Sequence, residues 1–323
     1  MRDHRLSTSL LRLSFLTITV LLLPASSLAQ AQTPTKPAAP AVRAEMLVST
    51  DWLAKHLNDP KVVVLHIARE RSHYDQGHIP GARFIAWNEL TTTRDGLQNE
   101  LPTVEDLQKL FERVGASDDT RLVLYGDNAP LAAARAYFTL DYLGHGDLAA
   151  LLDGGIEKWK AEQRALSTDA PQVKAARFTP HPRPQAVVDL KTMLNLSRAA
   201  ANNASSGTTL LDARPADDYT GARGGGAARS GHIPGAENLH WLQIVTSRET
   251  TTLRPVEELR KIYETCGIPS GGKIVTYCGS GVQASYAYFV AKYLGYDAAM
   301  YDGSFSEWSK TEAAPVVSGK EKK

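Results

Sequence analysis

The residues best suited to covalent chemistry lie in one short segment of the chain's second half. Cys278 follows an apolar run, residues 273–277, that is typical of a buried strand, and residues 283–294 carry apolar side chains at helical spacing. A cysteine between a strand and a helix N-terminus lies where backbone N–H groups converge and the helix dipole is positive. Both effects favour thiolate over thiol. We therefore predict that Cys278 is a nucleophile.

The loop after this cysteine has the composition expected of an anion-binding turn. Gly279 and Gly281 would let the chain curl so that successive N–H groups face the sulfur, because glycine adopts positive φ at little steric cost. The serine hydroxyl would point to a leaving group or a bound sulfur, or would instead bond its own backbone. The alternative for the cysteine is a small buried side chain beside a simple turn. The loop consists of Gly279, Ser280, Gly281, Val282 and Gln283.

The other cysteine, Cys266, has a different setting. It lies next to Gly267 at the end of an expected helix, where a half-buried C-cap position is favoured. Two cysteines without paired spacing indicate neither a disulfide framework nor a structural zinc site. A disulfide between Cys266 and Cys278 would remove the nucleophile, so we expect none.

The sequence contains two copies of one unit. A His-Ile-Pro-Gly-Ala motif occurs at residues 78–82 and again at 232–236, and two further short motifs recur in the same order. A repeat of about 150 residues is too long for a solenoid unit and predicts two domains of one kind. The further matches are residues 123–125 with 275–277 and 142–144 with 293–295, and Asp153, Gly154 and Trp159 with Asp302, Gly303 and Trp308.

The copies share their framework but differ at the nucleophile. The first copy has Gly126 where the second has Cys278, so it offers no sulfur nucleophile. His78 and His232 occupy matched turns in both copies, and we therefore expect them to serve the fold. The matched tryptophans are expected to pack in the two cores.

Each copy alternates short apolar runs with helical patterns. This alternation predicts an α/β fold, in which a parallel sheet is flanked by helices. In such sheets ligands bind beyond the carboxyl ends of the strands, which is where Cys278 lies. Strands are expected at 62–65, 121–125, 149–152, 209–211, 273–277 and 298–301, and helices at 104–114, 131–143, 256–265 and 283–294.

The N-terminal segment is typical of a secretory signal. Three arginines precede an apolar run of 11 residues, and small residues then allow cleavage after Ala29 or Ala31. A membrane anchor, the alternative, needs about 20 apolar residues. We expect a periplasmic or secreted protein. The expected organisation is a signal peptide at 1–31, a flexible leader at 32–45, an N-terminal domain at 46–165, a linker at 166–184, a C-terminal domain at 185–312 and a tail at 313–323.

Composition narrows the classes of partner. The chain has 323 residues, of which 43% are hydrophobic and 22% charged, which is enough for two domains with their own cores. The net charge is +1, and it becomes −1 when residues 1–29, with three arginines and one aspartate, are removed. No basic stripe is present, so no nucleic-acid partner is expected. Nor is membrane binding expected once the signal has been removed.

Three motifs of the second copy resemble those of tandem-domain rhodaneses, a family of sulfurtransferases. They are residues 232–236, residues 277–282 and residues 301–304, the last followed by Glu307 and Trp308. The resemblance spans about residues 46–312. It implies two rhodanese-like domains, the first catalytically inactive and the second with a catalytic cysteine, here Cys278. In that family the cysteine takes a sulfane sulfur from a small donor, becomes a persulfide, and passes the sulfur to cyanide or a thiol.

The residue types in the loop support this chemistry independently of the resemblance. A thiolate would attack the donor sulfur, and the loop's N–H groups would hold the persulfide until the acceptor arrives, which gives ping-pong kinetics. The expected partners are thus a small sulfur donor and a small acceptor. No metal or organic cofactor is required.

The resemblance leaves the donor open between thiosulfate and 3-mercaptopyruvate. The loop is similar to that of mercaptopyruvate sulfurtransferases, whereas thiosulfate-preferring relatives carry basic residues just after the cysteine. This chain departs from the former at Asn88, where those enzymes have an aspartate, and at Asp218, where they have a carboxylate-binding arginine. Candidates for binding the donor are therefore Asn88, Arg214, Arg223 and Arg229.

Other interpretations remain beside this one. Asp212 and Arg214 are favoured as a structural pair at a strand end. A phosphatase or arsenate reductase of related fold would need an arginine six residues after the cysteine, and that position is Ala284. A non-enzymatic persulfide carrier or partner-binding module stays open, because persulfide chemistry at Cys278 would serve it equally well.

Overall fold

The computed structural model describes residue 1 and residues 39–126, 130–202, 207–224, 226–269 and 271–320. The described residues from 39 onward belong to one compact unit. The expected signal peptide and the first part of the leader lie outside the described residues. Among the helices of the described part, none has both the length and the apolar character needed to span a bilayer.

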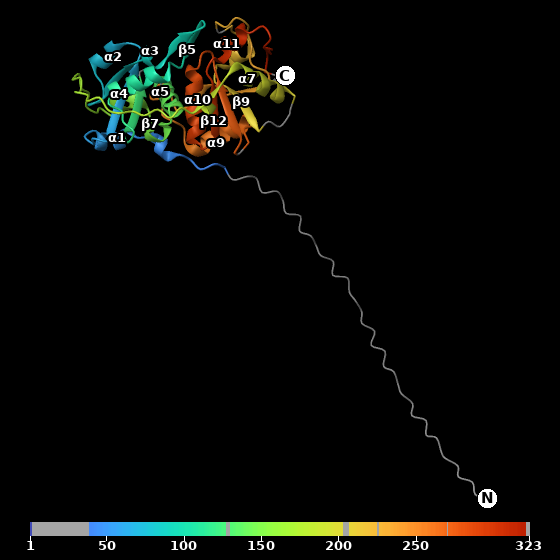
Figure 1. Ribbon diagram of the computed structural model, residues 1–323, viewed down its shortest axis with the longest axis horizontal. Coiled ribbons are helices and arrows are strands. Elements are labelled where there is room, and N and C mark those ends of the chain that lie inside the picture. The colour runs from blue at the N-terminus through green and yellow to red at the C-terminus, as the bar shows by residue number, and fades with distance from the viewer. Residues whose placement is uncertain (2–38, 127–129, 203–206, 225, 270, 321–323) are drawn as a thin grey trace. The chain divides into compact units, whose positions relative to one another are not determined.

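The first half of the chain forms a five-stranded parallel sheet (Figure 1). Its two central strands are buried along nearly their whole length, as their runs of valine and leucine require. In spatial order the strands are β1 (Leu47–Val48), β7 (Ala149–Leu152), β6 (Arg121–Gly126), β2 (Val62–Ala68) and β3 (Arg83–Ala86).

The second half repeats this sheet strand for strand. All neighbouring strands are again parallel, and the matching positions follow one another in the same spatial order. The prediction of an α/β fold with two parallel sheets is confirmed. The order is β8 (Val187–Val188), β12 (Asp297–Tyr301), β11 (Lys273–Tyr277), β9 (Thr208–Asp212) and β10 (Ala236–Asn238). The first half also contains an antiparallel hairpin of β4 (Thr92–Arg94) and β5 (Leu97–Glu100).

Helices flank both sheets. Helices α1, α4 and α7 each follow a residue whose side-chain oxygen accepts an N–H bond from the first turn: Ser49, Thr103 and Asp189. The four helices expected from periodicity are present within one residue at either end. The helices are α1 (Thr50–His56), α2 (Arg71–Gln76), α3 (Trp87–Leu90), α4 (Val104–Arg113), α5 (Leu131–Tyr142), α6 (Gly155–Ala161), α7 (Leu190–Ala201), α8 (Ala216–Thr220), α9 (Val256–Thr265), α10 (Val282–Tyr293) and α11 (Ser304–Lys310), with 3₁₀ turns at Ala44–Met46, Gly146–Leu148, Pro184–Ala186 and Trp241–Ile244.

The two halves pack through α5 and α10, which lie side by side between the sheets (Figure 1). Tyr137 packs edge-on against Phe289, and Phe138 against Tyr288, with ring centroids 5.0 and 5.1 Å apart. Both helices are buried nearly all round, because each has its own sheet on one side and the other helix on the opposite side. The amphipathic pattern expected from the sequence therefore understates their burial.

The segments that follow α6 and α11 close the two domains in the same way. Backbone bonds join His78 to Ser167, and His232 to Val317, as isolated antiparallel bridges. Each histidine is fully buried and stacks on a tyrosine of its own domain, with ring centroids 3.7 Å apart. The matched histidines therefore serve the fold, and the tail is fixed to the second domain as far as the structure describes it.

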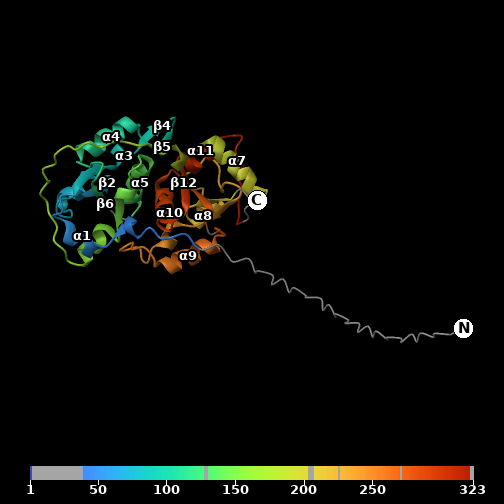
Figure 2. The same ribbon diagram turned by 60° about the horizontal axis from the view of Figure 1, so that its bottom comes forward.

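The linker is likewise fixed, to the first domain. Phe178 is fully buried and stacks on Phe111 and His145. Arg183 donates its backbone N–H to the carbonyl of Tyr142 over 2.7 Å. Figure 2 shows the segment running around the outer side of the first domain.

The prediction of a flexible leader at residues 32–45 is wrong for the last residues of that segment. The Pro40 carbonyl accepts a 2.6 Å bond from Arg260, and the Arg43 N–H donates to the carbonyl of Tyr293 over 2.8 Å. The Arg43 side chain meanwhile pairs with Asp147 of the first domain. The segment thus contacts both domains. Its proline-rich composition indicates flexibility and gives no sign of these contacts, which are made with residues distant in the sequence.

Candidate active site

Cys278 lies between β11 and α10 with only 2% of its surface exposed. Backbone N–H groups of Ser280, Gln283 and Ala284 act on its sulfur and lower the pKa of the thiol. Gly281 makes this turn possible with φ of 80°. The expected convergence of N–H groups on the sulfur is therefore present.

Two opposing effects act on the acidity of this thiol. Burial raises the pKa of Cys278, and the three backbone N–H bonds lower it, with a net direction above the ordinary value. From the loop and the helix dipole alone we expect a lowered pKa, and the loss of water around the sulfur reverses this direction. The N–H groups favour an anionic sulfur, whereas the closed surroundings resist forming one from the free thiol.

The turn between β12 and α11 holds the loop from behind. The hydroxyl of Ser304 accepts bonds from the N–H groups of Cys278, over 3.3 Å, and Gly281, over 3.0 Å, and donates to the carbonyl of Tyr301. Backbone N–H groups at the start of α11 bond to the carbonyls of Cys278 and Gly279. Ser304 was not singled out from the sequence, although it follows the repeated Asp-Gly motif.

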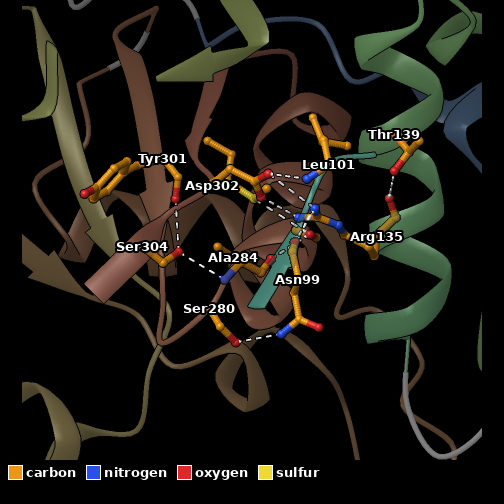
Figure 3. A network of polar contacts seen from close by, with 12 residues as sticks. Asn99, Leu101, Arg135, Thr139, Ser280, Ala284, Tyr301, Asp302 and Ser304 are labelled. Carbon is orange, nitrogen blue, oxygen red and sulfur yellow. Dashed lines mark hydrogen bonds and ion pairs between the residues drawn. The ribbon is translucent and has the colours of Figure 1, made fainter. Parts of the chain in front are cut away.

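The Ser280 hydroxyl is fixed by the first domain. It accepts a 3.0 Å bond from the side-chain amide of Asn99, in β5 (Figure 3). The amide oxygen of Asn99 accepts a bond from the indole N–H of Trp87. The contact between Asn99 and Ser280 differs from both bonds considered for Ser280 from the sequence. A hydroxyl that accepts from Asn99 can still donate its own proton to a group in the pocket.

A buried ion pair connects the same hairpin to the turn behind the loop. Arg135 of α5 binds Asp302 over 2.6 Å and the Asn99 carbonyl over 2.5 Å, while Asp302 also accepts from the N–H of Leu101 (Figure 3). Because Asp302 lies two residues before Ser304, the first domain holds the turn that supports the cysteine loop.

The first domain has no room for a thiol at the matching place. A Cβ atom on Gly126 would lie 2.8 Å from the Cβ of Ala132 and 2.9 Å from the carbonyl oxygen of Ile67. A cysteine there would require the backbone to move. The first domain thus contributes to the site through α5 and the hairpin.

A pocket of about 290 Å³ opens above Cys278. It has room for a small organic anion or thiol, and one first-domain residue, Leu131, reaches its wall. The described residues that line it are Leu131, Arg214, Asp218, Gly226, Ala227, Cys278, Gly279, Ser280, Val282, Gln283, Phe305 and Ser306. A second, larger cavity of about 510 Å³ is lined by Asp302 and Glu100. Burial and the nearby charge of Asp302 raise the pKa of Glu100 to about 7.

Arg214 lines the pocket, but its guanidinium is already hydrogen-bonded to neighbouring residues. Its guanidinium binds both carboxylate oxygens of Asp212, the shortest contact being 2.6 Å, and donates to the Gly231 carbonyl. It also lies over the ring of Phe305 at 4.0 Å. The geometry is that of the structural pair favoured from the sequence.

The other candidate residues are not brought to the wall of this pocket. Arg229 donates to three backbone carbonyls at the end of α11 and beyond, and so fixes the chain there. Asn88 lines a separate depression beside α4. Arg223 pairs with Asp218, and it is the acid of this pair that faces the pocket.

Cys266 lies at the C-cap of α9, as expected, and its thiol approaches the Asn238 carbonyl at 4.0 Å. Neither cysteine forms a disulfide. Among the described residues, no three histidine, cysteine or carboxylate side chains gather as a metal ion would require.

Comparison with known proteins agrees with this geometry. The family model of the rhodanese-like domain matches residues 49–162 and 195–311. The chain is 38% identical to the sulfur carrier protein TtuD of Thermus thermophilus over 286 residues, which cover 86% of this chain and 98% of that protein. It is 33% identical to a putative thiosulfate sulfurtransferase of Mycolicibacterium smegmatis, over 86% of this chain and 99% of the relative.

A solved structure of similar fold is the anaerobic ergothioneine biosynthesis enzyme of Chlorobium limicola, in complex with trimethyl histidine. The TM-score is 0.73 with 27% identity, over 85% of this chain and 70% of that enzyme. Two parallel α/β domains and a cysteine held in an N–H loop define a tandem sulfurtransferase scaffold. The chain belongs to the rhodanese family.

The buried ion pair between the domains gives a first testable prediction. We expect Arg135→Met to lower the free energy of unfolding by about 3–5 kcal/mol, because Asp302 would keep a buried charge without its partner. Denaturant unfolding of both proteins measures the change. Lys109→Met, which breaks an exposed pair with Glu105, is the control and should have a much smaller effect. Equal effects of the two substitutions would show that the buried pair does not hold the domains together.

Proposed function

We propose that the protein moves a sulfane sulfur from a small donor to cyanide or a thiol through a persulfide on Cys278. The observation that carries the proposal is the convergence of three backbone N–H groups on the buried cysteine sulfur at the base of a pocket. Thiosulfate and 3-mercaptopyruvate are the donors that fit the loop's chemistry. The relatives, which include proteins named putative thiosulfate sulfurtransferases, support the reaction class.

The two half-reactions follow from the loop. In the first, the Cys278 thiolate attacks the outer sulfur of thiosulfate, the S–S bond breaks, and sulfite leaves with the bonding electrons. In the second, the acceptor attacks the outer sulfur of the persulfide, and Cys278 leaves as a thiolate. The N–H groups of the loop stabilise negative charge on sulfur in both steps.

Ser280 has a defined place in this sequence of steps. Its hydroxyl, oriented by Asn99, donates a proton or a hydrogen bond to the group that leaves the donor sulfur. For 3-mercaptopyruvate the leaving group is an enolate, which needs such a donor more than sulfite does. Ser280 therefore acts on the donor half-reaction.

A sulfur carrier is the second candidate function. The relative named a sulfur carrier protein, at 38% identity, favours it. A carrier would form the same persulfide but would pass the sulfur only to a protein partner. Steady turnover with thiosulfate and cyanide would favour the enzyme, and one round of loading without turnover would favour the carrier.

The proposal predicts that Cys278→Ser abolishes sulfur transfer. Serine keeps the size of the side chain but is a far weaker nucleophile, so kcat/KM should fall by roughly a thousandfold or more. Thiocyanate formation from thiosulfate and cyanide is the measurement. Cys266→Ser, which changes the cysteine outside the pocket, is the matched control and should keep most of the activity. Thiocyanate formation by the Cys278→Ser protein at the wild-type rate would refute the proposal.

We also propose that the protein is exported, on the evidence of the arginines, the apolar run and the small residues within its first 31 residues. Cleavage is expected after Ala29 or Ala31. N-terminal sequencing of the protein from the periplasmic or secreted fraction of a Gram-negative host tests this. Export with Met1 still present would contradict a cleaved signal.

A further inference from the structure

The pocket above Cys278 has an unusual charge arrangement for a site that handles anionic sulfur donors. Among the described residues that line it, only Arg214 and Asp218 are charged. Arg214 already binds Asp212 through two nitrogen atoms, so its positive charge is compensated next to it. The pocket is left with a carboxylate on its wall.

Asp218 belongs to an ion pair whose acidic end faces inward. Arg223 binds its two carboxylate oxygens over 2.7 and 2.8 Å. The side chain of Asp218 is 12% exposed and lines the pocket, whereas that of Arg223 is 59% exposed and does not. Water screens the outer charge more than the inner one, so a molecule in the pocket experiences mainly the carboxylate.

The ionisation of the surrounding groups supports this charge balance. The hydrogen bonds from Arg223 hold the pKa of Asp218 below its usual value, so this acid is charged at neutral pH. Arg214 and His240 also lie within electrostatic reach of Asp218. Burial lowers the pKa of His240, which leaves it mostly uncharged, and Arg214 is paired with Asp212.

On the basis of the persulfide mechanism proposed above, we propose that Asp218 is a specificity-determining residue that favours cationic aminothiols over anionic thiols as sulfur acceptors. The ammonium group of an aminothiol would approach the free lone pairs of the carboxylate while its thiolate attacks the outer sulfur of the Cys278 persulfide. The S–S bond then breaks, Cys278 is released as a thiolate, and the aminothiol becomes a persulfide. A carboxylate-bearing thiol would meet like charge at the same place.

Three small thiols of similar length test this selectivity. They are cysteamine, which is cationic, 2-mercaptoethanol, which is uncharged, and 3-mercaptopropionate, which is anionic. Thiosulfate is the donor throughout, because in ping-pong kinetics kcat/KM for the acceptor reports only the second half-reaction. Each variant is compared with the wild type for the same acceptor, so that the different acidities of the thiols cancel.

We expect Asp218→Asn to lower the ratio of kcat/KM for cysteamine to that for 3-mercaptopropionate by roughly tenfold, the size expected of one partly exposed charge. The ratio is taken on one protein preparation, so a partly folded variant does not distort it. The values for 2-mercaptoethanol show any general loss. A ratio unchanged by Asp218→Asn would overturn the assignment of Asp218.

A double-mutant cycle separates the two members of the pair. If Arg223 acts by compensating Asp218, Arg223→Ala should raise the ratio, and the Asp218→Asn, Arg223→Ala protein should have a ratio below that of the wild type but above that of Asp218→Asn. If Arg223 instead binds anionic substrates directly, the double variant will use 3-mercaptopropionate as poorly as Arg223→Ala does, and the proposal is wrong.

The outcomes also distinguish this inference from the function on which it rests. Transfer to all three thiols with unchanged ratios would leave the sulfurtransferase intact and remove only the role of Asp218. Absence of transfer by the wild type to any thiol, and to cyanide, would overturn both.

Discussion

The site depends on one buried ion pair that joins the two domains. Arg135 is fully buried in α5 of the first domain, and Asp302 is almost as buried in the second. Each charge loses its hydration on folding, so the pair is stable only where further hydrogen bonds complete it. The Asn99 carbonyl, in the first-domain hairpin, and the N–H of Leu101, directly after it, supply them. The turn behind the cysteine loop is thereby fixed relative to the first domain.

This arrangement explains how a domain without a nucleophile takes part in the chemistry. The β4–β5 hairpin belongs to the first domain, and its Asn99 reaches across to the hydroxyl of Ser280. The cysteine loop is held on one side by Ser304 and on the other by Asn99. A loop fixed from both sides keeps its N–H groups directed at the sulfur, so little reorganisation is needed when charge develops there.

Much of the fold follows from sequence patterns, because those patterns are local or repeated. The runs that form β11 and α10 have the right period, and the duplicated motifs give two domains of one kind. The position of Cys278 between strand and helix follows from the same reading. Its burial does not, and burial is what reverses the expected shift of its pKa.

The contacts that a single sequence could not supply are those between distant residues. Asn99 meets Ser280 across 181 positions, and Arg135 meets Asp302 across 167. Asp302 lies in a repeated Asp-Gly motif, but that motif does not identify Arg135 as its partner. The arginines near the pocket were candidates by type and proximity in sequence. Only the structure shows that Arg229 binds backbone carbonyls and that Arg223 is compensated by Asp218.

The central claim is that Cys278 carries the transferred sulfur. Its most direct test is the mass of the peptide that contains Cys278. The wild-type protein is treated with thiosulfate, the excess thiosulfate is removed, the mass is measured, and the protein is then exposed to cyanide and measured again. The account predicts that this peptide gains the mass of one sulfur atom and loses it again on exposure to cyanide, with the peptide of Cys266 unchanged. A protein that turns over thiosulfate while the added sulfur never appears on Cys278, or appears on Cys266, would contradict it.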